Sequence, residues 1–359
     1  MERRSFLKKA TAGAVTAGIA APALAQSLPT LNWRLASSFP KSLDTLFGTA
    51  EVFAQRVAQL TGGKLNIRVF AAGEIVPGLQ VVDAVQAGTV EIGHTAPYYF
   101  FGKDPTFAFD CAVPFGMNSR QQTAWFLQGG GRELLRDFYK DYGIMNFLGG
   151  NTGGQMGGWF RKEIKSLQDL KGLKMRISAF AGKVLEPLGL VPQQLAGGDI
   201  YPALEKGTLD AVEWTSPYDD EKLGFFKVAP FYYAPGWWEA GAQLAFYVGI
   251  KQWEKLPKEY QNAIEVASFE AHAHMQARYD AQNPVALARL IKNGTKVRFF
   301  SKNIMEASYK AAMETMEQEA AKNAKFKKIY EPYKRFQRDQ NQWFSVVESP
   351  MMSFMSARR

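Results

Sequence analysis

Two short stretches, VVDAVQAGTVEIGHTAP at residues 81–97 and IYPALEKGTLDAVEWTSP at residues 200–217, decide the fold. Each contains a helical run, a Gly-Thr pair, a hydrophobic residue followed by an acid, and then a short strand. Gly88 and Gly207 align, and glycine suits the left-handed position that ends a helix. The apolar residues after each glycine are typical of a buried parallel strand. The chain therefore contains two related αβ units, and we expect one in each of two domains.

Apolar runs around these two units predict the remaining strands. A helix at 43–60 and a turn at 61–63 separate the first two strands. The predicted strands cover residues 33–37, 64–70, 143–151, 173–178, 209–214 and 242–250.

The order of these elements predicts an α/β protein in which two domains with parallel or mixed sheets enclose a hinged cleft. Domain I comprises residues 26–149 and about 240–283, because the strand at 242–250 returns to the first sheet. Domain II comprises 150–239 and about 284–325, and long C-terminal helices include 326–359. A chain that crosses more than once forms a hinge, which permits closure on a ligand.

The N-terminus has the order of an export signal. Arg3 and Arg4 precede a weakly apolar run and then Ala23-Leu24-Ala25, so residues 1–25 are predicted to be a twin-arginine signal peptide for the periplasm. Residues 1–25 hold four basic residues and one acid, so their removal lowers the net charge from +9 to +6. This mildly basic balance favours small organic anions, and export argues against nucleic acid. The single cysteine, Cys111, excludes a disulfide framework.

A glycine-rich stretch, GGNTGGQMGGWFR at 149–161, surrounds one glutamine, Gln155. Glycine lets the backbone approach a ligand closely, and an amide oxygen suits a hard cation. A strand edge with a buried glutamine is the structural alternative. No phosphate-binding pattern follows.

Two charged residues lie at strand positions. Arg176 interrupts an apolar strand, and a buried guanidinium requires an anionic partner. We favour a ligand carboxylate as that partner, with Glu213 as the alternative. Glu213 and the backbone carbonyl of Trp214 end another strand and are suited to Na⁺ or Ca²⁺, although Glu213 also fits an ordinary solvated strand end. Glu213, Arg176, a ligand carboxylate and a monovalent cation together sum to zero charge.

Histidine and aromatic residues add less. His94, His272 and His274 have no partner at metal-ligand spacing, so they are predicted to be structural. Among the aromatic pairs in loops, only Tyr99 is a candidate site residue, through its hydroxyl donor.

The chain resembles the solute-binding proteins of tripartite ATP-independent periplasmic (TRAP) transporters, in particular the branch that binds 2-oxo acids. The resemblance covers essentially all of residues 26–359. It is carried by GNTGGQMGGWFRKEI (150–164), DLKGLKMRISAFAGKVLEPLG (169–189), GGDIYPALEKGTLDAVEWTSPYDD (197–220) and IKQWEKLP (250–257).

This resemblance implies roles for the candidate residues. Arg176 would clamp the solute carboxylate, and Gln155, Glu213 and the Trp214 carbonyl would bind Na⁺ or, alternatively, Ca²⁺. The solute-binding residues implied are Arg176, Asn151, Gln155, Tyr99, Trp214 and Gln243. Similar proteins also form homodimers by exchanging a C-terminal helix, which residues 326–356 would supply.

The sequence thus predicts a non-catalytic receptor that binds a small 2-oxo or 2-hydroxy monocarboxylate together with a cation. It would deliver this solute to an integral membrane permease. The alternative is a metal-dependent periplasmic enzyme acting on a 2-oxo acid, which requires a base close to the substrate carbon. A purely structural partner acting through its C-terminal helix predicts no stabilisation by small molecules.

Overall fold

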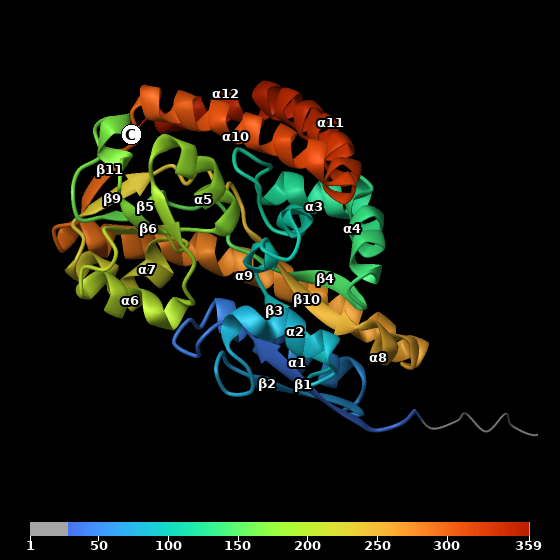
Figure 1. Cartoon of the computed structure of the whole chain (residues 1–359). Helices are drawn as coiled ribbons and strands as arrows, with labels where there is room; N and C mark the ends of the chain where they lie inside the picture. Colours follow the sequence, from blue (N-terminus) through green and yellow to red (C-terminus); the bar gives the residue numbers. More distant parts are fainter. Residues whose placement is uncertain (1–27, 359) are drawn as a thin grey trace, which may run out of the picture.

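The computed structural model describes residues 28–358. The predicted signal peptide lies outside the described residues. Two sheets form the framework, with helices on their faces and the C-terminal helices along one side (Figure 1).

The first sheet has five strands in the order β2-β1-β3-β10-β4. Strands β1, β2 and β3 are parallel, whereas β10 is antiparallel to both β3 and β4, so the sheet is mixed. The bounds are β1 (Leu31–Ser37), β2 (Leu65–Phe70), β3 (Ile92–Thr95), β4 (Ile144–Asn151) and β10 (Gln243–Gly249). The return of the strand predicted at 242–250 to the first sheet is confirmed.

The second sheet has six strands in the order β11-β9-β5-β8-β6-β7. The strands are β5 (Gly158–Phe160), β6 (Lys174–Arg176), β7 (Val191–Gln193), β8 (Ala211–Val212), β9 (Phe231–Ala234) and β11 (Lys296–Phe299). Strands β6 and β8 are shorter than predicted, because β8 pairs with its neighbours along two residues only. Parallel pairing of β8 with β6 agrees with the αβ unit that the sequence predicts there.

Helices pack on both sheets and join them. Those following strands of the first sheet are α1 (Leu46–Leu60), α2 (Val81–Gln86), α3 (Ser119–Gln128), α4 (Gly131–Lys140) and α8 (Ile250–Glu254). Those beside the second sheet are α5 (Ala179–Leu185), α6 (Gly197–Glu205), α7 (Pro217–Leu223) and α10 (Lys302–Lys322). The longest are α9 (Lys258–Lys292) and α11 (Ala324–Val347), and the last is α12 (Ser349–Ser356).

Both repeat glycines end their helices as predicted. Gly88 and Gly207 have φ angles of 71° and 75°, a left-handed conformation that glycine adopts without a steric penalty. Each follows its helix, α2 or α6, by two residues and leads into a strand. The internal repeat therefore has a backbone basis.

The connections between the sheets pass through the centre of the molecule. The chain leaves the first sheet after β4, returns between β9 and β10, and leaves again through α9. Helix α9 contacts α1 and β4 of the first sheet and α7 beside the second (Figure 1). The boundary expected near residue 283 falls inside this continuous helix, so α9 links the two halves rather than ending with one of them.

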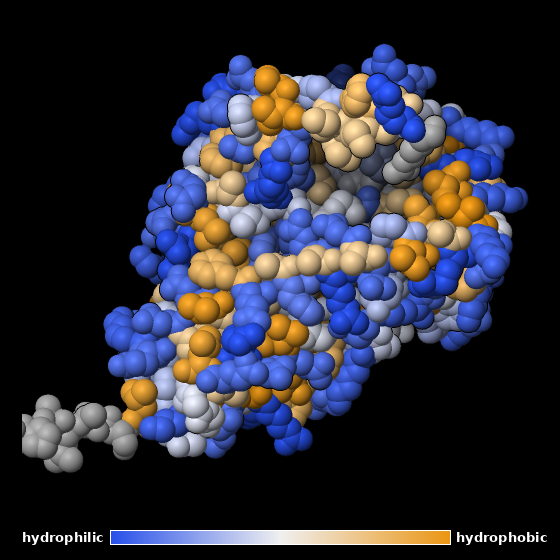
Figure 2. Space-filling model, turned by 180° about the vertical axis from the view of Figure 1, so that it is seen from behind, coloured by the Kyte–Doolittle hydropathy of each residue, from blue (hydrophilic) through white to orange (hydrophobic). Residues whose placement is uncertain are grey.

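The surface opposite the view of Figure 1 is mainly hydrophilic, with hydrophobic residues in separate clusters (Figure 2). Within the described part of the chain, no helix combines the length and apolar character needed to cross a bilayer. Most of the large apolar side chains are instead buried between the sheets and their helices.

Candidate functional site

The glycine-rich loop begins where β4 ends and leads into β5, so it spans the two sheets. A Cβ on Gly150 would lie 2.3 Å from Met275, and one on Gly158 would lie 2.5 Å from the Val212 carbonyl oxygen. These glycines therefore permit close packing against the protein. The expectation that glycine clears space for a ligand is wrong at these two positions.

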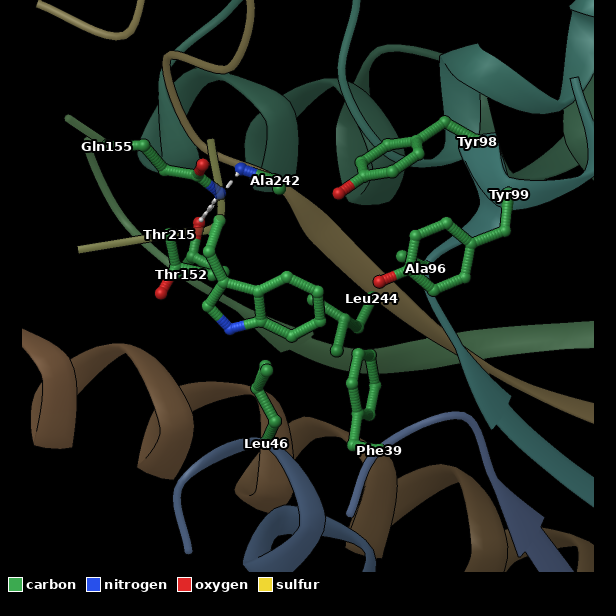
Figure 3. A pocket seen from close by; sticks show the side chains of 11 residues that line it. Phe39, Leu46, Ala96, Tyr98, Tyr99, Thr152, Gln155, Thr215, Ala242 and Leu244 are labelled. Carbon is green, nitrogen blue, oxygen red and sulfur yellow. Dashed lines mark hydrogen bonds between the residues drawn. The ribbon is translucent and has the colours of Figure 1, made fainter. Parts of the chain in front are cut away.

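A hydrogen bond within this loop fixes the orientation of the Gln155 side-chain amide. Its Nε2 donates to Thr152 Oγ1 at 2.9 Å, while its buried Oε1 has no hydrogen-bond partner among the described residues. Thr152 Oγ1 also accepts from the backbone N–H of Ala242 at 3.2 Å, which ties the loop to the start of β10 (Figure 3). The amide oxygen is thus presented without a protein donor.

Arg176 forms a buried ion pair with Glu213, and their side chains are 1% and 0% exposed. Strands β6 and β8 are neighbours, so the two side chains meet, and Arg176 Nη1 donates to Glu213 Oε2 at 2.8 Å. Nη1 also donates to the Glu213 carbonyl at 2.6 Å, and Nε to the Leu195 carbonyl at 3.3 Å. Glu213, the alternative partner that the sequence offered, therefore pairs with Arg176, and binding of a ligand carboxylate by Arg176 stays a prediction. None of the three hydrogen bonds uses Nη2.

Glu213 retains one oxygen that the ion pair does not use. Its Oε1 is buried and has no hydrogen-bond partner among the described residues. Burial and the nearby Glu239 carboxylate raise the pKa of Glu213 above its usual range, and Arg176 opposes this shift.

Glu239 is a buried acid that sequence reasoning missed. It lies between β9 and β10, is 1% exposed, and neither of its carboxylate oxygens has a hydrogen-bond partner within residues 28–358. Burial raises the pKa of Glu239 to about 7, although Arg176, Ser178 and Gln155 lie close enough to lower it. The sequence signal that could have identified Glu239 is its position directly after the aromatic pair Trp237-Trp238.

A pocket between the two sheets lies beside these charged groups. Its free volume in this structure is only about 10 Å³, roughly the space of one water molecule, so the two domains enclose it tightly. Tyr98 and Tyr99 point their hydroxyls into it from one side (Figure 3). Its lining comprises Phe39, Leu46, Ala96, Tyr98, Tyr99, Thr152, Gln155, Trp214, Thr215, Ala242 and Leu244.

The predicted site residues occupy different places relative to this pocket. Tyr99, Gln155 and Trp214 line it. Arg176 lies against the Trp214 ring, with its guanidinium carbon 4.8 Å from the ring centroid. Asn151 and Gln243 do not line the pocket; they pair across β4 and β10.

Asn151 and Gln243 make hydrogen bonds that position their surroundings. Asn151 Oδ1 accepts from the backbone N–H of Gly153 at 2.9 Å, which shapes the glycine-rich loop. Gln243 Nε2 donates to Asp110 Oδ1 at 3.1 Å. Of the three histidines expected to be structural, His94 and His272 are buried, and burial lowers the pKa of each to about 4, whereas His274 is exposed on α9.

The donor set fits a hard cation. In the described part of the chain, Gln155 Oε1, Glu213 Oε1 and both oxygens of Glu239 are buried without hydrogen-bond partners, a costly arrangement that a bound metal would relieve. No group of three or more His, Cys, Asp or Glu residues suited to a metal occurs in residues 28–358. A cation here would therefore depend on amide and backbone oxygens in addition to two carboxylates.

Residues 36–323 match the model of a known family, bacterial extracellular solute-binding protein, family 7. The chain belongs to this family. Its members are receptors for solutes, which agrees with a pocket between two domains and with the TRAP resemblance of the sequence motifs.

Close relatives of this family 7 protein have been described. A monocarboxylate 2-oxoacid-binding periplasmic protein of Nostoc is 48% identical over 99% of this chain and 100% of its own length. A TRAP transporter solute-binding protein from Bordetella bronchiseptica, with calcium and picolinate in its active site, is 52% identical with a TM-score of 0.91. The match covers 92% of this chain and 98% of the Bordetella protein.

A third relative binds a different ion. The solute-binding protein from Pseudoalteromonas atlantica, with bound sodium and pyruvate, is 38% identical with a TM-score of 0.88. It covers 90% of this chain, and 99% of that protein is matched. These likenesses confirm the predicted two-domain α/β fold.

Proposed function

We propose that this protein is the periplasmic receptor of a TRAP transporter and that it binds a small 2-oxo or 2-hydroxy monocarboxylate together with a cation. One observation carries the proposal: unpartnered oxygens of Gln155, Glu213 and Glu239 gather beside Arg176, next to an interdomain pocket. Such oxygens bind a hard cation, and a cation beside a guanidinium attracts a carboxylate.

A bound cation would balance the charge of the site when its acids are ionised. With both acids ionised, Glu213, Glu239 and Arg176 sum to one negative charge, and the bound acid adds another. Ca²⁺ neutralises these two negative charges, whereas Na⁺ leaves one of them. The count made from the sequence did not include Glu239, and it therefore reached zero with Na⁺. Relatives hold either ion, so both belong in the test.

The proposed roles follow from atoms left free by the fold. Glu213 would bridge, with Oε2 on Arg176 and Oε1 on the cation. Arg176 Nη2 and the Tyr99 hydroxyl would bind the solute carboxylate, and the Trp214 carbonyl would add a cation ligand. Asn151 and Gln243 would act by holding the loop and β10 in place.

Calorimetric titration tests the proposal. We expect pyruvate, lactate or 2-oxobutyrate to bind in the presence of Na⁺ or Ca²⁺ and to bind at least about tenfold more weakly without either ion. Glu239→Gln should abolish most of this cation dependence, whereas Glu254→Gln, an exposed acid elsewhere, should behave as the wild type. Absence of binding for every short acid with either ion would overturn the proposal.

The same samples test the enzymatic alternative. A receptor returns its acid unchanged, so NMR spectra of pyruvate after long incubation should show no new species. We further propose export by the twin-arginine route, delivery to the membrane permease subunits of the transporter, and a homodimer formed through the C-terminal helices.

A further inference from the structure

We infer that Leu46, supported by Phe39, sets the chain length of the acid that this receptor accepts. The inference rests on the proposed function and adds to it a residue that determines specificity.

The pocket has a polar side and an apolar side. In this view Gln155 and Thr152 lie at the left of the pocket, and Tyr98 and Tyr99 point their hydroxyls into it from the right (Figure 3). Glu239 of the charged cluster is close to both Gln155 and Tyr98. Leu46 and Phe39 lie below these polar groups and form the apolar wall of the pocket in this view (Figure 3). An acid whose carboxylate and 2-oxygen bind at the polar side must therefore direct its alkyl end toward this apolar wall.

The wall is held rigidly within domain I. Ser38, the residue before Phe39, is fixed by two hydrogen bonds. Its Oγ is hydrogen-bonded to the Gly78 carbonyl oxygen and to Thr95 Oγ1, each at 2.6 Å. Phe39 packs edge-on against His94, with ring centroids 5.5 Å apart. Leu46 begins helix α1 and is buried, as is Leu43 in the preceding turn.

Because the wall formed by Leu46 and Phe39 is rigid, the affinity should depend on the length of the alkyl chain of the bound acid. Each methylene that fits into apolar surroundings strengthens binding by about fourfold, whereas one that meets a fixed wall must displace packed atoms. Shortening Leu46 removes wall atoms at the alkyl end without touching the groups proposed to hold the carboxylate or the cation.

The experiment compares affinities for unbranched 2-oxo acids, from pyruvate to 2-oxohexanoate, in saturating Na⁺ or Ca²⁺. We expect Leu46→Ala to improve the affinity for 2-oxohexanoate relative to pyruvate by about tenfold or more over the wild type. Leu46→Val removes less and should give a smaller shift in the same direction, which keeps the test available if the alanine variant folds poorly.

Leu43→Ala is the matched control, because Leu43 is buried in the same segment and does not line the pocket. It should leave the affinity ratio unchanged. If the wild type binds 2-oxo acids but both Leu46 variants retain its ratio, this inference is overturned and the proposed function stands. If the wild type binds none of these acids, the proposed function fails and the inference fails with it.

Discussion

Arg176 and Glu213 form a buried ion pair at the ends of adjacent strands. Arg176 Nη2 and Glu213 Oε1 take no part in this pair. Taking two charges out of water is costly, and their mutual attraction offsets this cost only while both are present. The pair therefore supports the fold and at the same time presents Glu213 Oε1 for binding.

Removing Arg176 alone should destabilise the protein strongly, because Glu213 is then left buried without a partner. In the absence of cation and acid, we expect Arg176→Met to lower the free energy of unfolding by about 3–5 kcal/mol. The double variant Arg176→Met/Glu213→Gln should lose less. Urea unfolding measures both, with Arg289→Met, which breaks a surface pair with Glu221, as a control worth about 1 kcal/mol or less. A single variant no less stable than the double would contradict this account.

Asp110 is another buried acid, and burial raises its pKa to about 7. The pKa of an aspartate in the unfolded chain is about 4, so the folded protein retains this proton to higher pH. Asp110 thus contributes stability that is complete below about pH 4 and is lost as the pH rises through about 7.

Replacing Asp110 should flatten this part of the stability profile. Between about pH 5 and pH 8, we expect Asp110→Asn to lose less stability than the wild type, by an amount on the order of 3 kcal/mol. Urea unfolding at several pH values measures the difference. Asp339→Asn, an exposed acid, should follow the wild-type curve. Parallel curves for Asp110→Asn and the wild type would show that Asp110 is not the titrating group.

At the level of elements, helix α11 changes character along its length. Its first turns pack on the chain itself, and Tyr333 Oη accepts from the Met117 backbone N–H at 3.0 Å. The end of α11 and helix α12 instead expose a series of large apolar side chains. These are Trp343, Val346, Val347, Met351, Met352, Phe354 and Met355.

An exposed apolar face of this size is suited to association with a second copy. We expect the double variant Trp343→Glu/Met352→Glu to be monomeric in analytical ultracentrifugation where the wild type is dimeric, and to bind its acid unchanged. Leu60→Glu, at an exposed apolar position on α1, should leave the dimer intact. A wild type that is monomeric at every concentration would refute the proposed homodimer.

For the whole molecule, ion pairs cross the cleft between the domains. Asp44, just before α1, pairs with Lys222 of α7 and with Arg278 of α9, and it accepts from the Tyr218 hydroxyl at 3.1 Å. Asp44 is 44% exposed, so salt screens these contacts. They stabilise the arrangement in which the two domains are close.

Asp44→Asn should therefore weaken acid binding by up to about fivefold at low ionic strength, with a smaller effect at high ionic strength. Titration calorimetry at both salt concentrations measures this. Glu74→Gln breaks a comparable surface pair with Lys41 inside domain I and should not change the affinity. Equal effects of the two substitutions would mean that Asp44 does not act through domain closure.

Much of the architecture follows from local patterns. The strand that returns as β10 and the glycines that end α2 and α6 were predictable, because strand and helix-end signals reside in a few consecutive residues. Gln155, Glu213 and Trp214 were recognisable as a group for the same reason, since each lies in a short distinctive motif.

The tertiary structure alone decided how these residues are combined. It paired Arg176 with Glu213, brought Glu239 from a distant loop to the same cluster, and packed Gly150 and Gly158 against protein atoms. The physical reason is that burial, charge balance and close packing depend on residues far apart in the chain. A sequence motif specifies which oxygens are available, but only the folded chain determines which of them remain without a partner.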